Sequence, residues 1–275
     1  MSLSSKSIGL NEYVDDILND ELNKNDGKNS DKMICEISED INFKFNSFNV
    51  CIGKQGTGKT TSVLKELIKL SLMFRNNQRS DQSGQCPYHL IIYVTNNSSD
   101  ATFNSLYKHI NIPIVKTNYE QIDKQIEQLI KLKDIYNKIK DGVLSSSDIN
   151  VNELLKSLYI NDFRLSRLHT FILLDDSAFL LKNENSKWNK WLCQLRHLNF
   201  TVFMCVQIWK SINTSIKSQI TSIHLFRGFS RQQLRYIYQQ ITLDIDFEDL
   251  MRLYLSLPKN KKMIIDLIDM TFIID

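Results

Sequence analysis

Residues 53–60 read G-K-Q-G-T-G-K-T, which matches the P-loop pattern G-x-x-x-x-G-K-[ST] at every position. In this pattern the backbone N–H groups of a glycine-rich turn surround a chain of phosphates. We expect Gly53, Gly56 and Gly58 to take positive φ angles and to let the backbone approach a ligand closely. We expect Lys59 to reach the β- and γ-phosphates, and the hydroxyl of Thr60 to ligate Mg²⁺.

The segments on either side of this turn have the character of a strand and a helix. Residues 45–52 first mix apolar and polar residues and then become continuously apolar, which is typical of a buried strand. After the turn, apolar residues recur at helical spacing, so we predict a helix from about Lys59 whose positive end faces the phosphates. The predicted nucleotide-binding residues are Gly53, Lys54, Gln55, Gly56, Thr57, Gly58, Lys59, Thr60 and Thr61. The alternative is a chance glycine-rich turn between a strand and a helix.

Length and composition are those of a globular protein. The chain has 275 residues, of which 42% are hydrophobic and 24% are charged, and this is ample for one large α/β domain. We expect an acidic arm and linker over residues 1–40, with a helix-forming stripe at 10–22, and an ATPase domain over 41–275. No run of about 18 apolar residues occurs and the N-terminus lacks an apolar signal core. We therefore expect no membrane-spanning segment and no secretion.

The net charge of +3 is spread unevenly. Acidic residues exceed basic ones in residues 1–40, whereas basic residues exceed acidic ones in the remainder. A basic body suits a polyanionic partner. Ordinary surface charge explains the same distribution equally well.

Strand-like and helix-like stretches alternate along the chain. Strands are predicted at 45–52, 89–94, 112–115, 170–176, 200–206 and 222–226, with a terminal hairpin at 262–268 and 271–274. Besides the helix after the turn, helices are predicted at 119–139, 151–159, 188–197 and 231–240. This alternation predicts a mostly parallel sheet with helices on both faces.

A second group of candidate site residues follows the strand F-I-L-L-D-D. Asp175 ends an apolar run, which is where a P-loop protein places the carboxylate that holds Mg²⁺ through water. Asp176 comes next, at the position where hydrolytic P-loop enzymes usually have a glutamate base that orients water. Aspartate is one methylene shorter, and this weakens the assignment of Asp176 as the base. The alternative is that both aspartates cap a helix.

The order of the strands in the sheet is left open. In kinases and small GTPases the strands that carry the P-loop and the metal carboxylate are often neighbours, whereas helicases, motor ATPases and recombinases insert a strand between them. The strand at 89–94 lies between these two in the sequence.

Two further residues are candidates for catalysis. Gln207 ends the strand at 200–206, where it is placed to sense the γ-phosphate, unless it only bonds to local backbone. Arg196 precedes that strand and is a candidate arginine finger for a neighbouring subunit's nucleotide. A surface arginine favoured by the helix dipole is an equal alternative. Arg227 and Arg231 are fallback candidates for the finger.

Four segments together resemble the poxvirus-type DNA-packaging ATPases of the FtsK–HerA superfamily, which large DNA viruses and virophages encode. These segments read G-K-Q-G-T-G-K-T, F-I-L-L-D-D, R-H-L-N-F-T-V-F-M-C-V-Q and S-I-H-L-F-R. The resemblance extends over about residues 45–275 and includes the terminal hairpin. The R-H-L-N segment together with the terminal glutamine makes it specific, since the P-loop alone is shared by many families.

The resemblance implies a ring of six subunits that uses ATP and Mg²⁺ to thread double-stranded DNA into a capsid. It also implies a docking partner among the capsid or portal-vertex proteins, and a location in the host cytoplasm, at the viral factory, or in the virion. By position, Lys59 and Thr60 bind the triphosphate and Mg²⁺, Asp175 holds Mg²⁺ and Asp176 polarises water. Gln207 senses the γ-phosphate and Arg196 is the candidate finger.

Three other functions are compatible with the motifs. The first is another oligomeric P-loop ATPase, such as a helicase or an AAA-type protein remodeler. The second is a nucleotide kinase, although no arginine-bearing lid is evident in the sequence. The third is a non-catalytic nucleotide-binding assembly factor, which the aspartate at position 176 keeps open.

Overall fold

A computed structural model describes residues 41–77, 86, 88–96, 101–145, 149–161, 163, 165, 167–176, 180, 187–258 and 261–275. The acidic arm expected over residues 1–40, with its helical stripe, lies outside these residues. The described residues belong to two compact units. The predicted boundary between the arm and an ATPase domain over 41–275 stays a prediction.

The described residues of the smaller unit are mainly helical. It contains α2 (Lys59–Asn77) from Thr61 onward, α3 (Ala101–Leu106) and the short 3₁₀ helix η1 (Tyr107–His109). Helix α2 begins at Lys59, where the sequence predicts it. The first two residues of α2 belong to the larger unit, so the glycine-rich turn and the start of the helix are described together below.

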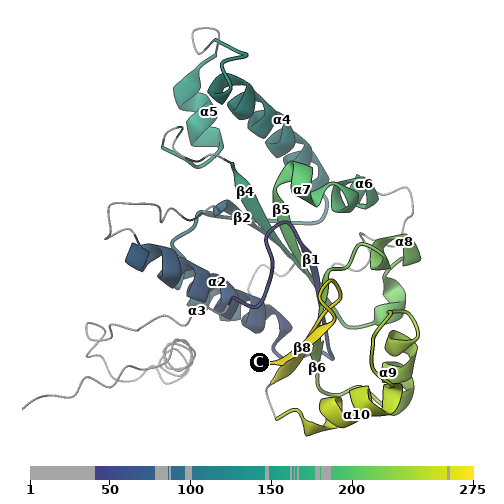
Figure 1. The fold of residues 1–275 in the computed structure, drawn as a ribbon. Coiled ribbons are helices and arrows are strands. Elements are labelled where there is room, and N and C mark those ends of the chain that lie inside the picture. Colours follow the sequence, from purple (N-terminus) through teal and green to yellow (C-terminus); the bar gives the residue numbers. More distant parts are fainter. Residues whose placement is uncertain are drawn as a thin grey trace, which may run out of the picture. The chain divides into compact units, whose positions relative to one another are not determined.

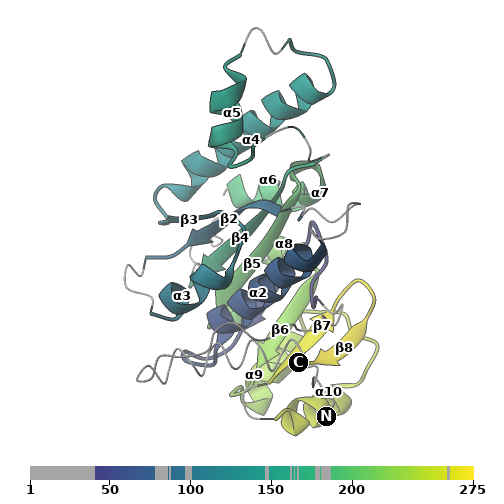
Figure 2. The same ribbon diagram turned by 90° about the vertical axis from the view of Figure 1, so that its left-hand side faces the viewer.

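The larger unit contains the whole sheet. Its strands are β1 (Phe48–Ile52), β2 (Tyr88–Val94), β3 (Ile114–Thr117), β4 (His169–Asp175), β5 (Phe200–Val206), β6 (Ser222–Phe226), β7 (Lys262–Asp266) and β8 (Thr271–Ile274). They are arranged in the order β3-β2-β4-β5-β1-β6-β7-β8. The first six strands pair in parallel, whereas β6 with β7 and β7 with β8 pair antiparallel, as Figure 2 shows for the terminal hairpin.

This strand order shows whether a strand is inserted between the P-loop strand and the strand that ends at the candidate metal carboxylate. β1, which feeds the glycine-rich turn, and β4, which ends at Asp175, are not neighbours, because β5 lies between them and pairs with both. The inserted strand is the one that precedes Gln207, not the strand β2 that lies between β1 and β4 in the sequence. Because all three strands are parallel, Ile52, Asp175 and Val206 end at the same edge of the sheet.

The remaining helices of the larger unit are α4 (Ile122–Lys140), α5 (Val151–Ser157), α6 (Lys187–Cys193), α7 (Leu195–Leu198), α8 (Thr214–Lys217), α9 (Arg231–Tyr238), α10 (Phe247–Ser256) and the 3₁₀ helix η3 (Trp209–Ser211). Helices α4 and α5 contact each other, as do α9 and α10 (Figure 1). The helix predicted at 188–197 is two helices, because Gln194 leaves the helical conformation with φ −117° and ψ 17°. None of the helices that the structure describes has the length and apolarity needed to span a bilayer.

One hydrophobic core joins the strands to these helices. Every residue of β1 and β5 is buried, as expected for central strands with both faces covered. Trp188 of α6, Leu234 of α9 and Leu250 of α10 pack into the same cluster as the strands. The continuous apolar strands predicted from the sequence are therefore the centre of the fold, and the carboxyl ends of these strands are held rigidly.

Candidate nucleotide-binding site

The glycines of the turn satisfy two different requirements. Gly56 and Gly58 have φ angles of 74° and 83°, as the motif predicts. The expectation of positive φ at Gly53 is wrong, since Gly53 is not among the positive-φ glycines. A Cβ atom there would lie 2.6 Å from Thr57 Oγ1 and 2.7 Å from Phe226 Cβ, so Gly53 is needed for close packing.

Short hydrogen bonds hold the turn on the sheet. The amide of Gly53 donates to the carbonyl oxygen of Val206 at 3.2 Å, which ties the start of the turn to the end of β5. The hydroxyl of Thr57 donates to the carbonyl oxygen of Lys54 at 2.8 Å and closes the turn on itself. The turn is therefore preformed.

Lys59 lies inside this turn, at the start of α2. Its side chain is buried, and its ammonium nitrogen donates to the carbonyl oxygens of Gly53 and Lys54, each at 3.0 Å. No acidic residue occupies the first turn of α2, so nothing there neutralises the positive end of the helix dipole. An ammonium group, a glycine-rich turn and a helix N-terminus form a site that suits a phosphate chain.

Thr60 and Asp175 are brought together at the carboxyl edge. The hydroxyl of Thr60 donates to Asp175 Oδ1 at 2.7 Å, across a sequence separation of 115 residues. The phenol of Tyr93, near the end of β2, donates to Asp175 Oδ2 at 3.3 Å. Both oxygens of the carboxylate are thus held in place. Hydroxyl and carboxylate oxygens are the hard ligands that Mg²⁺ takes, so this pair fits the ion.

Asp176 and Gln207 form a second pair beside the first. Asp176 follows β4 with a φ angle of 52°, a left-handed conformation that aspartate tolerates better than most residues. The amide nitrogen of Gln207 donates to both carboxylate oxygens of Asp176, at 3.1 and 3.2 Å. Gln207 therefore bonds to the neighbouring strand's aspartate rather than to local backbone. Both side chains are exposed, so both are accessible to a ligand.

Two tyrosines near these carboxylates were not identified from the sequence. Burial raises the pKa of Tyr119, and the negative charges of Asp175 and Asp176 raise it further, so this phenol stays protonated. Tyr93 is fully buried and donates to Asp175. The sequence gives little indication of this contact, because Tyr93 lies in a buried strand and resembles an ordinary aromatic residue of the core.

Arg196 lies at the amino edge of the sheet, where the parallel strands begin, opposite the edge that carries the glycine-rich turn. Helix α7, which carries it, ends immediately before the amino end of β5, and Arg196 is exposed. Asn199 caps α7 in a left-handed conformation with φ 52°. The structure therefore does not bring Arg196 together with Lys59, Thr60 and the two aspartates of the same chain.

A buried lysine supports the segment that carries Arg196. Lys133 of α4 donates from its ammonium nitrogen to the carbonyl oxygen of Leu198 at 2.5 Å, and that nitrogen lies 4.6 Å from the centre of the Phe200 ring. Burial lowers the pKa of Lys133 to about 7. Lys133 of α4 thus helps to hold the R-H-L-N segment in place.

The fallback arginines lie on the carboxyl side of β6. Arg227 directly follows that strand and is exposed. Arg231 opens α9, pairs with Glu248, and its guanidinium lies 5.7 Å from the centre of the Phe247 ring. Of the two, Arg231 is the more constrained.

Comparisons with known proteins agree with this architecture. No protein-family model matches the sequence, and a search of curated proteins finds no match. The fold is similar to that of the genome packaging NTPase B204 from Sulfolobus turreted icosahedral virus 2 in complex with AMP, with a TM-score of 0.53 and 15% identity over 83% of this chain and 96% of that one. It is also similar to B204, the DNA-packaging ATPase from Sulfolobus turreted icosahedral virus, with a TM-score of 0.51 and 13% identity over the same shares. The chain has the fold of the P-loop NTPases.

Proposed function

We propose that this chain is an ATPase that moves double-stranded DNA into a viral capsid, working as a homo-oligomeric ring of six subunits. Its fold is that of solved viral packaging NTPases. Its motifs resemble those of the poxvirus-type packaging ATPases. The docking partner in this proposal is a capsid or portal-vertex protein, and the site of action is the viral factory in the host cytoplasm or the virion.

The observation that carries the ATPase assignment is the meeting of three strand ends at one edge. The turn after β1, Asp175 at the end of β4 and Gln207 after β5 come together there, joined by the Thr60–Asp175 and Gln207–Asp176 hydrogen bonds. If the glycine-rich turn were a chance match to the motif, the hydroxyl of Thr60 and the carboxylate of Asp175 would not be expected to pair beside it. The inserted strand β5 favours a motor ATPase over a kinase.

Each residue has a defined role in this proposal. Lys59 moves its ammonium from the carbonyls of the turn to the β- and γ-phosphates, and Thr60 and Asp175 hold Mg²⁺. The bound ion supplies charge neutralisation on the phosphates. Asp176 orients water as the base, and Gln207, which contacts Asp176, reports the presence of the γ-phosphate.

Arg196 acts on a different subunit in this proposal. It lies at the amino edge, away from the phosphate site of its own chain, so a finger role requires a neighbouring copy. The helix cap at Asn199 and the contact from Lys133 hold its segment in one position. Arg227 and Arg231 remain alternatives, because they lie on the carboxyl side of β6.

Steady-state ATP hydrolysis with and without linear duplex DNA tests the proposal, with Lys59→Ala as the control. We expect hydrolysis that DNA stimulates and that the control lacks. Hydrolysis that depends on Lys59 but not on DNA would favour a protein remodeler. ATP binding without hydrolysis would favour the nucleotide-binding assembly factor that the shorter Asp176 side chain keeps open.

A further inference from the structure

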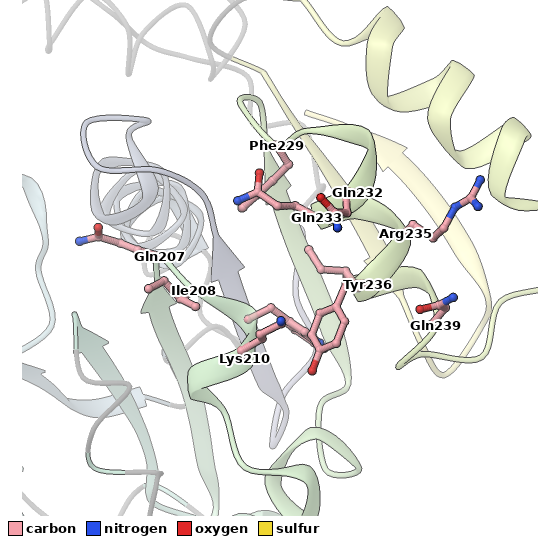
Figure 3. Close-up of a pocket in the computed structure, with 11 residues that line it drawn as sticks. Gln207, Ile208, Lys210, Phe229, Gln232, Gln233, Arg235, Tyr236 and Gln239 are labelled. Atoms are coloured by element: carbon pink, nitrogen blue, oxygen red, sulfur yellow. The ribbon is translucent and has the colours of Figure 1, made fainter.

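A cavity of about 520 Å³ lies beside Gln207, between the segment that follows β5 and helix α9. Figure 3 shows Lys210 and Tyr236 side by side in it, with Gln232 and Gln233 near Phe229. The nucleotide site described above does not use this pocket, apart from Gln207.

The lining of the pocket has no negative charge. It contains the two cationic side chains of Lys210 and Arg235, whereas no aspartate or glutamate lines it. Three glutamine side chains add amide groups that can donate to an anion. These are Gln232, Gln233 and Gln239, whereas the amide of Gln207, which also lines the pocket, donates to Asp176. A pocket with this lining favours an anionic ligand and disfavours a cationic one.

Two lysines lie near the ring of Tyr236, and of these Lys210 lines the pocket, whereas Lys217 adjoins it without being part of its lining. The ammonium nitrogen of Lys210 lies 4.7 Å from the centre of the Tyr236 ring, and that of Lys217 lies 5.9 Å from the same centre. Lys217 also lies 5.4 Å from the centre of a ring of Trp209 and donates to Gln240 Oε1 at 3.0 Å. In the part of the chain that the structure describes, no ion pair joins either lysine to a carboxylate.

Two positive charges near one ring create a positive local potential, so an anion that binds there is attracted by both. Partial burial of the Lys217 side chain lowers its pKa. Arg235 differs from them, because Glu248 lies 3.8 Å away and its guanidinium lies over the Phe247 ring. The two lysines are therefore the strongest candidates for contact with an external anion.

We propose that the pocket beside Gln207, together with the adjoining Lys217, binds phosphodiester groups of duplex DNA, with Lys210 and Lys217 as the charged contacts and the amides of Gln232, Gln233 and Gln239 as additional donors. The inference rests on the proposed function, which supplies the polyanion. Contacts of this kind read the backbone rather than the bases, so they would accept any sequence. A motor that passes a whole genome requires such indifference to sequence.

Gln207 connects this pocket to the phosphate site. Its side chain lines the pocket and also donates to both carboxylate oxygens of Asp176. Lys210 lies three residues further along the same segment, within η3. A phosphodiester held by Lys210 therefore acts on a short segment whose first residue touches the candidate catalytic base.

Equilibrium binding of a fluorescently labelled random-sequence duplex, measured by anisotropy without ATP over a range of salt concentrations, tests this proposal. The variant is Lys210→Gln with Lys217→Gln. We expect its affinity at low salt to fall at least about tenfold, and the slope of log affinity against log salt to decrease by about 2, since each phosphate contact contributes about 0.9. Thermal unfolding confirms that the variant folds.

Lys131→Gln is the matched control, because it removes an exposed lysine of α4 outside the pocket. It should change the affinity less than twofold or so, as expected for a screened surface charge. If the wild-type protein binds duplex and DNA stimulates its ATPase while the double variant binds equally well, the pocket assignment fails and the proposed function stands. If the wild type binds no duplex, both fail. Polyglutamate is a second probe, as a model of an acidic peptide. If the double variant loses binding to polyglutamate but binds DNA as the wild type does, the assignment to DNA is overturned in favour of an acidic peptide.

Discussion

The two edges of the sheet carry polar side chains of similar kinds that differ in burial. At the carboxyl edge, the bonded pairs of Thr60 with Asp175 and of Gln207 with Asp176 are half-buried or exposed. At the amino edge, several bonded side chains are buried, and they bond either to one another, as Tyr88 does to Thr201, or to backbone carbonyls. Lys133 donates to Leu198, and a ring nitrogen of His89 lies 2.8 Å from the carbonyl oxygen of His169.

This difference separates groups that can exchange partners from groups that cannot. A hydroxyl or amide that bonds to a carboxylate can turn to a phosphate or a metal ion when either one binds. The ammonium of Lys59 can do the same, because its carbonyl partners belong to the turn that would receive the phosphates. The buried ammonium of Lys133 lies at the other edge, and its loss would leave the carbonyl oxygen of Leu198 without this donor. We therefore assign the chemistry of each chain's own nucleotide site to its carboxyl edge and, within the same chain, positioning to the amino edge, and the following predictions test that division.

The largest effect is expected from Asp175→Asn. This substitution removes the carboxylate that accepts from Thr60 and that we assign to Mg²⁺, so hydrolysis should fall about 1,000-fold, the upper range for losing one electrostatic contact in a site. The measurement is kcat at saturating MgATP. Asp244→Asn, at an exposed position, is the control and should behave as wild type. Equal activity of the two variants would remove Asp175 from the site.

Asp176→Asn should lower hydrolysis about 100-fold while the affinity for ATP stays near that of the wild type, because a general base acts in the chemical step. Asparagine keeps the size of the side chain and one acceptor for Gln207. Hydrolysis and ATP affinity are to be measured separately. Unchanged hydrolysis would mean that Asp176 is not the base.

Lys133→Met tests the amino edge through the pH dependence of stability. The pKa of Lys133 is lowered by burial to about 7 in the folded chain, from 10.5. Between these two values the unfolded chain binds more protons than the folded one, so this lysine makes the free energy of unfolding rise with pH, by up to about 1.4 kcal/mol per pH unit. Below about pH 7 both states are protonated and this contribution no longer changes.

In the methionine variant this rise in stability between about pH 7 and 10.5 should disappear. The nearby His169 and His89, whose pKa values burial lowers to about 4 and 3, titrate in a more acidic window and do not obscure the result. Urea unfolding at a series of pH values measures the slope. An identical slope in the variant would show that Lys133 is ordinarily solvated.

The smallest effect is expected from Tyr93→Phe. It removes one neutral donor, 3.3 Å from Asp175, and leaves the buried ring in place. The Mg²⁺ concentration for half-maximal hydrolysis should rise about threefold, which corresponds to the loss of one modest hydrogen bond. A value unchanged from wild type would make Tyr93 a packing residue only.

Local features of the site could be predicted from the sequence, whereas relations between distant segments could not. The turn, the start of α2 at Lys59 and the apolar strands follow from short-range pattern and from the chemistry of glycine. The insertion of β5 between β1 and β4 depends on packing across the whole sheet, which no local pattern reports. The close packing of Gly53 against Phe226 and the bond from Tyr93 to Asp175 also join residues that are far apart in the sequence.

The position of Arg196 is different, because topology alone could have predicted it. A residue that precedes a parallel strand lies at the amino edge, opposite the glycine-rich turn. Its separation from Lys59 within one chain follows from chain order once the sheet is taken as parallel. The conformation of Asp176 could not be predicted, since a left-handed aspartate after a strand has no sequence signature of its own.

The division between the two edges is tested most directly by the affinity for MgATP, measured by calorimetric titration of Lys59→Ala and Arg196→Ala under identical conditions. Lys59→Ala removes the ammonium from the turn and should weaken binding at least about 100-fold, as expected for a charged contact to phosphate. Arg196→Ala should bind MgATP within about twofold of the wild type, because Arg196 lies at the other edge of its own chain. Full affinity in Lys59→Ala, or an equal loss in both variants, would contradict the account.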